Sequence, residues 1–219
     1  MINAILLDEP GPADRDALRT TARSLAAHGV HTLYRISAQR GSTPKGVIDV
    51  IRPQHRGPDD LLSLFSMGPR LMGEIIVIQG RVAVSQQIIG ALLATPSPGA
   101  MTVDRRWRDS DTPPAPGALY TEEEHGYINR LSADVLPQLA HGVYGGVMRF
   151  DAPLTARLWG LYLFARAQGR IPLPTGGVDL ADAGLHDLLN AAIEHEERLL
   201  AAPLDDRTQE TQAWSSPAT

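Results

Sequence analysis

The run Glu74-Ile-Ile-Val-Ile-Gln79 places consecutive β-branched apolar residues between two polar ones. A strand that alternates apolar and polar residues can leave one face in water, whereas an uninterrupted apolar run must be covered on both faces. The segment is therefore predicted to be a central strand of a sheet that has helices packed on both sides. This requirement makes an α/β fold the expected class.

Length and composition are sufficient for a self-supporting core. A chain of 219 residues with 43% hydrophobic content can bury roughly 70% of its unfolded surface. It has no cysteine, so we expect a reducing compartment and a cytoplasmic location. The start lacks the basic region of a signal peptide. The most apolar later stretch, 158–165, is far shorter than the roughly 20 residues that a membrane span needs, so no membrane partner is expected.

The first half of the sequence reads as alternating strands and helices. Before position 60, we predict strands over 3–8, 30–37 and 47–51 and a helix from Asp14 to Gly29, with the strands 30–37 and 47–51 paired as a hairpin. Asp59 or Asp60 is suited to cap a further helix. A helix over 86–94 and a strand over 101–107 complete residues 1–108, which we expect to form an α/β (α+β) core with a mixed sheet flanked by helices.

The second half is predicted to be mainly helical. Residues 109–118 are rich in proline and read as a linker, and residues 119–202 read as a helical lobe packed on the core. Three helices are expected there: one from Thr121, in a capping box with Glu124, through Val135; one capped by Asp151; and one over 182–201. Residues 203–219 are polar and are expected to be disordered.

Charge is distributed unevenly along the chain. The net charge is -5, yet residues 1–110 carry 13 Lys and Arg against 10 Asp and Glu, while residues 111–219 carry 7 against 15. The most basic segment runs from position 28 to position 56 and contains a single acidic residue, Asp49. Its cations are Arg35, Arg40, Lys45, Arg52 and Arg56. An anionic ligand, nucleic acid included, is expected to bind there. The alternative is that these arginines are solvated or cap loop ends.

Two carboxylates lie at apolar positions of predicted elements. Asp49 stands alone in the strand Val47 to Ile51, where it must either meet a partner or bind something. Glu196 falls on the apolar face of the last predicted helix. It must be paired, protonated or exposed where that helix ends.

The order helix, strand, strand, strand, helix, strand over residues 13–107 resembles the core of the PD-(D/E)xK nuclease superfamily. In that family an aspartate on the second strand and a Glu-x-Lys on the third hold a divalent metal and activate water. Here Asp49 lies in the second strand, and Gln79-Gly-Arg81 stands at the Glu-x-Lys position. The resemblance implies that Asp49 and Gln79 bind Mg²⁺ and that Arg81 steadies the attacking water or the phosphate of a nucleic acid. Gln and Arg depart from the family pattern, so the resemblance also allows a degenerate, inactive scaffold.

Other functions stay open at this point, including whether the chain is an enzyme. A non-catalytic regulatory or protein-interaction protein would use the acidic second half, with its apolar helix around Trp159, to bind a partner. Trp107 lies among Arg105, Arg106 and Arg108 and can stack on a base or on a partner's side chain. A small-molecule enzyme that uses the glycine-containing loop after Ser37 is a third alternative. The nuclease hypothesis requires Asp49, Gln79 and Arg81 to converge.

Overall fold

The computed structural model describes residues 2–7, 15–37, 43–51, 59–80, 83–110, 113–174 and 176–204. Within these ranges one mixed sheet has the strand order β3 (Val47–Ile51), β2 (Leu33–Ser37), β1 (Ile2–Leu7), β4 (Glu74–Gln79), β8 (Gly142–Phe150), β5 (Gly99–Asp104), β11 (Leu199–Pro203), β7 (Tyr127–Ser132) and β6 (Tyr120–Glu124). Strands β3, β2, β1 and β4 run parallel, and β8 runs antiparallel to both β4 and β5. The end of the sheet curls back, because β6 also pairs with β8.

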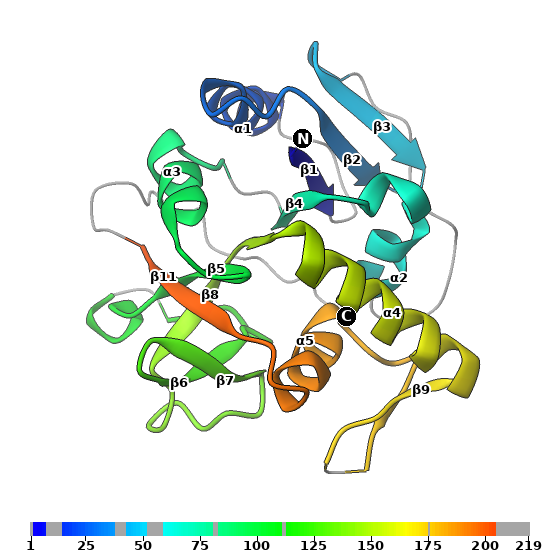
Figure 1. The fold of residues 1–219 in the computed structure, drawn as a ribbon. Coiled ribbons are helices and arrows are strands. Elements are labelled where there is room, and N and C mark those ends of the chain that lie inside the picture. Colours follow the sequence, from blue (N-terminus) through cyan, green and yellow to red (C-terminus); the bar gives the residue numbers. More distant parts are fainter. Residues whose placement is uncertain are drawn as a thin grey trace.

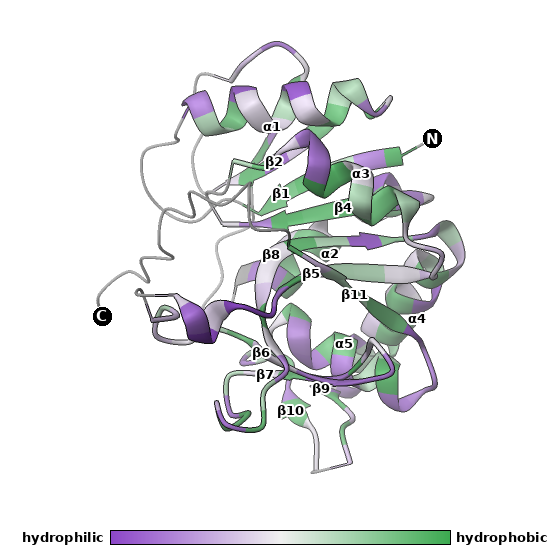
Figure 2. Cartoon of the chain, turned by 90° about the vertical axis from the view of Figure 1, so that its left-hand side faces the viewer, coloured by the Kyte–Doolittle hydropathy of each residue, from purple (hydrophilic) through white to green (hydrophobic). Residues whose placement is uncertain are grey.

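Helices cover both faces of the sheet (Figure 1). One face carries α1 (Arg15–Ala27) and α3 (Gln86–Ala94); the other carries α2 (Asp59–Ser66), α4 (Ala152–Gln168) and α5 (Leu185–Glu194). On β4, Ile76 and Ile78 pack toward α1 and α3, while Ile75 and Val77 pack toward the other three helices. These side chains are at most 2% exposed, which confirms the predicted central strand. Figure 2 shows that the strands β1 and β4 are largely hydrophobic.

Short elements complete the described chain. They are the single-turn helices η1 (Gly68–Leu71) and η2 (Trp107–Asp109) and the small antiparallel pair β9 (Arg170–Ile171) and β10 (Val178–Asp179). None of the described helices is long and apolar enough to cross a lipid bilayer.

Helix ends follow the local chemistry of the sequence. The Asp151 carboxylate accepts a hydrogen bond from the main-chain nitrogen of Leu154 at 2.8 Å, as predicted for the start of α4. At its other end, α4 stops at Gly169, whose φ of 71° is the left-handed conformation that glycine adopts without strain. Helix α3 is capped at its N-terminus by Ser85, whose hydroxyl accepts a hydrogen bond from the main-chain nitrogen of Ile88.

The predicted hairpin between the strands 30–37 and 47–51 is wrong in direction. β2 and β3 are neighbours, but they run parallel, with Leu33 opposite Val47 and Ser37 opposite Ile51. A five-residue strand is about 17 Å long, and the connection 38–46 can span about 30 Å when extended. The connection is therefore long enough to return the chain to the start of the neighbouring strand without a helix.

The predicted helix from Thr121 through Val135 is also wrong, because this segment forms the hairpin of β6 and β7. The apolar positions that suggested a helix, Ile128 and Leu131, are three residues apart and both buried. The register shows why: Glu122 pairs with Arg130 and Glu123 pairs with Ile128, so a β-bulge adds one residue between the two pairs. The bulge changes the alternation from two residues to three, which imitates a helical period.

The mixed sheet flanked by helices is confirmed, but residues 119–202 contain β6, β7, β8 and β11 besides α4 and α5. Strands on both sides of the segment 109–118 thus belong to the same sheet. The last predicted helix ends early, since α5 stops at Glu194 and β11 begins at Leu199. Glu196 lies between them, exposed, with a φ of 64°. Most of the predicted disordered tail, 205–219, lies outside the described residues.

Candidate functional site

The strands β2, β1, β4 and β5 end along one edge of the sheet, which we call the carboxyl edge. The chain passes from β1 to β2 on one side, whereas β4 flanks β1 on the other. The strand order therefore reverses between β1 and β4. Open α/β sheets bind ligands outside the carboxyl ends of their strands at such a switch point. This edge is the candidate functional site.

Arginines follow these strands in the sequence. They are Arg40 after β2, Arg52 and Arg56 after β3, Arg81 after β4, and Arg105, Arg106 and Arg108 after β5. Arg40, Arg52, Arg56 and Arg81 lie outside the described residues. A positive potential at the ends of parallel strands favours an anionic ligand.

A half-buried carboxylate joins three elements beneath this edge. Asp60, in the first turn of α2, accepts a hydrogen bond from the side-chain nitrogen of Gln79 at 2.9 Å. It also accepts from the main-chain nitrogen of Leu185 at the start of α5, at 3.2 Å to either oxygen, and from the nitrogen of Leu61 at 2.7 Å. Burial raises the pKa of Asp60 above its ordinary 3.8, although the main-chain donors of Leu185 and Leu61 and the nearby His186 lower it in part.

The hydroxyl of Tyr144 lies near the Asp60 carboxylate. Tyr144 is 4% exposed, and its oxygen has no hydrogen-bond partner among the described residues. Burial raises the pKa of Tyr144 well above its ordinary value, and the negative charge of Asp60 raises it further. The hydroxyl is therefore neutral at physiological pH. Asp60 and Tyr144 make the interior side of the carboxyl edge polar.

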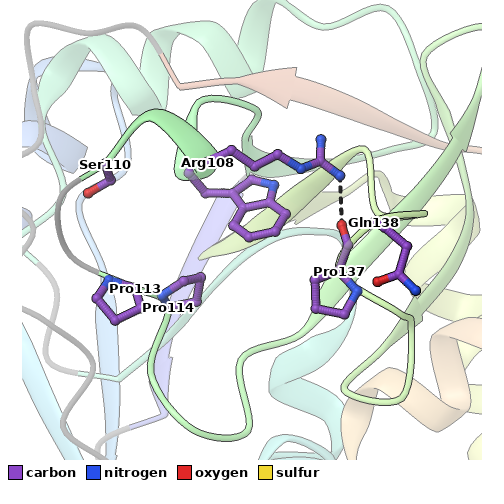
Figure 3. A pocket seen from close by; sticks show the side chains of 7 residues that line it. Arg108, Ser110, Pro113, Pro114, Pro137 and Gln138 are labelled. Atoms are coloured by element: carbon purple, nitrogen blue, oxygen red, sulfur yellow. Dashed lines mark hydrogen bonds between the residues drawn. The ribbon is translucent and has the colours of Figure 1, made fainter.

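A hollow of about 480 Å³ lies beyond the end of β5. The η2 turn and the following segment form one side, and the connection between β7 and β8 forms the other. Its lining residues are Trp107, Arg108, Ser110, Pro113, Pro114, Pro137 and Gln138. Figure 3 shows Pro113 and Pro114 across the hollow from Pro137 and Gln138, with Arg108 reaching over it.

Arg108 is held in a defined position at this hollow. One of its terminal nitrogens donates to the carbonyl oxygens of Pro137, at 2.6 Å, and Ala140, at 2.8 Å. Its guanidinium carbon lies 4.8 Å from the centre of the Trp107 ring, and that ring packs edge-on against Tyr120. These neutral groups orient Arg108 without cancelling its positive charge, which therefore acts on the hollow.

Asp49 meets a partner inside the sheet. Its carboxylate lies 3.3 Å from the guanidinium of Arg35, its direct neighbour on β2, and the two side chains are 13% and 4% exposed. The pair lies on the face covered by α1 and α3, because Asp49 shares this face with Val47. Asp49 and Arg35 are therefore engaged with each other within the fold.

The metal site predicted from Asp49 and Gln79 does not form. β2 and β1 separate β3 from β4. Gln79 shares its face with Val77, which packs toward α2, α4 and α5, so the two side chains point to opposite faces of the sheet. Arg81 lies outside the described residues. The convergence that the nuclease hypothesis required is absent.

The predicted anion-binding set is divided by the fold. Arg35 is 3% exposed inside the sheet. Lys45 is exposed, but it lies in the turn that precedes β3 and therefore at the edge opposite the carboxyl edge. Arg40, Arg52 and Arg56 lie outside the described residues. The two described members of the predicted anion site, Arg35 and Lys45, therefore do not lie together.

Sequence reasoning missed the Asp60 cluster. Asp60 was recognised only as a helix cap, and the structure adds contacts to Gln79 and to Leu185, which is 125 positions further along the chain. Nothing in the local sequence points to so distant a partner. Tyr144 carried no signal either, because a buried tyrosine in a strand looks like core. Trp107 and its arginines, in contrast, were visible as a cluster.

No protein-family model and no curated protein matches this chain. Solved structures do resemble it. One, described as a glucose-1-phosphate thymidylyltransferase from Bacillus anthracis in complex with sucrose, has a TM-score of 0.59 and 11% identity, over 94% of this chain and 87% of its own. The nucleoside-diphosphate-sugar pyrophosphorylase from Vibrio cholerae RC9 has a TM-score of 0.55 and 12% identity, over 93% and 92%.

A third similar structure is the CTP:phosphocholine cytidylyltransferase from Streptococcus pneumoniae, with a TM-score of 0.61 and 13% identity, over 94% of this chain and 90% of that one. These likenesses extend over nearly the whole chain. They overturn the resemblance to PD-(D/E)xK nucleases, which rested on the order of elements in residues 13–107, and with it the nuclease and regulatory functions inferred above. At this level of identity they show the fold alone: the chain has the fold of these nucleotide-transferring enzymes.

Proposed function

We propose that this chain is a nucleotidyltransferase that joins a nucleotide to a phosphorylated small molecule at the carboxyl edge. The observation that carries the proposal is the agreement of the three similar structures. Each covers at least 93% of this chain, and each name describes an enzyme that transfers a nucleotide to or from a sugar phosphate or phosphocholine. The anionic ligand expected from the basic first half is then a nucleoside triphosphate, and the cytoplasmic location expected from the cysteine-free sequence is part of the proposal.

The topology and charge of this chain support the same site independently. The switch point between β1 and β4 is where an open α/β sheet receives a nucleotide. Arginines follow β2, β3, β4 and β5 in the sequence, and guanidinium groups suit phosphate oxygens geometrically. A triphosphate is bound by such groups through charge-assisted hydrogen bonds.

In this reaction a phosphate oxygen of the acceptor attacks the α-phosphorus of the nucleoside triphosphate. A new phosphorus–oxygen bond forms, the bond between the α- and β-phosphates breaks, and pyrophosphate leaves with the electron pair. Negative charge grows on the departing pyrophosphate, where fixed arginines are most effective. Asp60 lies beneath the edge as a positioning residue, because it holds the end of β4 through Gln79.

Mg²⁺ enters the proposal only as the companion of a triphosphate. The described residues contain no group of three His, Asp or Glu side chains that could hold a metal, and Asp49 and Gln79 do not converge. The arginines of this chain are the groups that we propose to bind the departing pyrophosphate.

The test is release of pyrophosphate from CTP, UTP, dTTP, ATP and GTP, each with Mg²⁺ and with either glucose 1-phosphate or phosphocholine. Arg81→Gln removes a cation directly after β4 and is expected to lower the rate by about ten-fold or more, the loss of one charge-assisted phosphate contact. Lys45→Gln is the matched control, since it removes one cation at the opposite edge and is expected to leave the rate unchanged. No pyrophosphate release with any pair, or equal losses in both variants, would contradict the proposal.

A further inference from the structure

The hollow beyond β5 has a distinctive chemistry. Its lining contains one cation, Arg108, and the neutral polar side chains of Ser110 and Gln138, beside Trp107 and three prolines. No acidic side chain is among these lining residues. A ligand that fits must therefore offer hydroxyls or negative charge to the polar groups and an apolar face to the rings.

A cation already lies over the face of the aromatic ring in the hollow. Arg108 lies over Trp107 with 4.8 Å between guanidinium carbon and ring centre. A quaternary ammonium is normally recognised through the faces of aromatic rings. Here it would meet a like charge at that ring. The nearby Glu123 is 5% exposed in its side chain and paired with Arg105, so it offers no compensating charge.

The hollow lies at a suitable distance for an acceptor. β5 is separated from β4 by β8 alone, which places the two strand ends about 10 Å apart. A nucleotide at the switch point between β1 and β4 and a second molecule beyond β5 would thus occupy neighbouring positions along the carboxyl edge.

We infer that the acceptor of this chain is a phosphorylated sugar or polyol, and that Arg108 disfavours an amino-alcohol phosphate such as phosphocholine, whose ammonium group is cationic. This inference rests on the proposed function and specifies its substrate class. The hydroxyls of the acceptor bind Ser110 and Gln138, its ring lies against the prolines, and its negative charge faces Arg108. Phosphocholine has the same phosphate but adds a cation, which would meet the like charge of Arg108 at the Trp107 ring.

Direct binding of glucose 1-phosphate and phosphocholine to the full chain, measured by calorimetry without nucleotide, tests the inference. Glucose 1-phosphate is expected to bind at least ten-fold more tightly than phosphocholine. Arg108→Gln and Gln138→Glu each make the charge of the hollow one unit more negative. Each is expected to weaken the binding of glucose 1-phosphate about ten-fold. In both variants the disadvantage of phosphocholine should shrink or vanish.

Two controls accompany these variants. Arg166→Gln removes an exposed cation from α4, outside the hollow, and should leave both affinities unchanged. Thermal melting checks the fold of each variant; Gln138 is exposed and hydrogen-bonds to no described group, so its variant tests the idea even if Arg108→Gln unfolds.

Different outcomes would contradict the substrate class and the proposed function. Equal or tighter binding of phosphocholine, no binding of glucose 1-phosphate, or glucose 1-phosphate affinities unaffected by Gln138→Glu would overturn the substrate class. If glucose 1-phosphate binds as expected but no nucleoside triphosphate releases pyrophosphate with it, the proposed function fails instead. Transfer of a nucleotide to phosphocholine in preference to glucose 1-phosphate would overturn the inference and leave the proposed function standing.

Discussion

Replacement of Asp60 by alanine is expected to loosen the junction of α2, β4 and α5. The change leaves the main-chain nitrogen of Leu185, a residue with 0% exposure, and the amide of Gln79 without their acceptor. Each unsatisfied buried donor costs about 1–3 kcal/mol, so we expect the free energy of unfolding to fall by about 2–5 kcal/mol. For a chain of this size, each kcal/mol lowers Tm by about 2–4 °C.

Asp60→Asn is the matched control, because it keeps one acceptor oxygen for the main-chain donors. The amide of Gln79 can turn to present its oxygen to the new side-chain NH₂ group. The expected loss at pH 7 is therefore below about 1.5 kcal/mol, well short of the alanine variant.

The stability of the wild-type chain and that of the Asp60→Asn variant should also respond differently to pH. Because burial raises the pKa of Asp60 in the folded chain above 3.8, the folded state binds this proton more tightly than the unfolded state. Its contribution to stability is then fully present below 3.8 and is lost as pH rises through the folded pKa. Relative to Asp60→Asn, the wild-type chain should gain stability as pH falls toward 3.8.

Urea unfolding of the three proteins at pH 7, and of wild type and Asp60→Asn at steps down to pH 4, measures these effects. An alanine variant within 0.5 kcal/mol of wild type would refute the role of Asp60 in this junction. If Asp60→Asn is as unstable as Asp60→Ala, the charge itself is required. If the stability of wild type relative to Asp60→Asn falls on acidification, the pKa of Asp60 in the folded chain is lowered and not raised.

Two further variants test the interior of the sheet. Asp49→Asn removes the charge from the pair with Arg35 and is expected to lower the free energy of unfolding by about 1–3 kcal/mol, while leaving any pyrophosphate release per folded molecule unchanged; a catalytic loss at unchanged stability would contradict this. Tyr144→Phe removes a buried hydroxyl that has no partner among the described residues, so stability should stay equal or rise by up to about 1 kcal/mol, and a clear fall in Tm would show that the hydroxyl is satisfied in solution.

Periodicity alone identified the layers of this fold but not the direction of its strands. The apolar run of β4 and the spacing of α1, α3 and α4 were sufficient to predict helices on both sides of a sheet. The parallel pairing of β2 with β3 could not be predicted, because a connection of this length permits either direction. The β6–β7 hairpin was hidden by its bulge, which set Ile128 and Leu131 three residues apart.

The candidate site was accessible from sequence only where residues cluster locally. Trp107 with its neighbouring arginines was visible as a group, and the excess of arginine in the first half stays a prediction of an anionic ligand. Asp49 was correctly judged to need a partner, but the sequence could not show whether this partner was a metal or Arg35. Asp60 depends on Gln79 and on the start of α5, and tertiary contacts of that separation leave no mark in local spacing.

The central claim, that a nucleotide binds at the carboxyl edge, is tested most directly by mapping amide chemical shifts while a nucleoside triphosphate with Mg²⁺ is added. We expect the largest changes at the amides of Gln79, Gly80 and Arg105, at the ends of β4 and β5. The amides of Gly46 and Gly73, which precede β3 and β4 at the opposite edge, should not move. Changes confined to Gly46 and Gly73, or no change with any of the five triphosphates up to millimolar concentration, would contradict the claim.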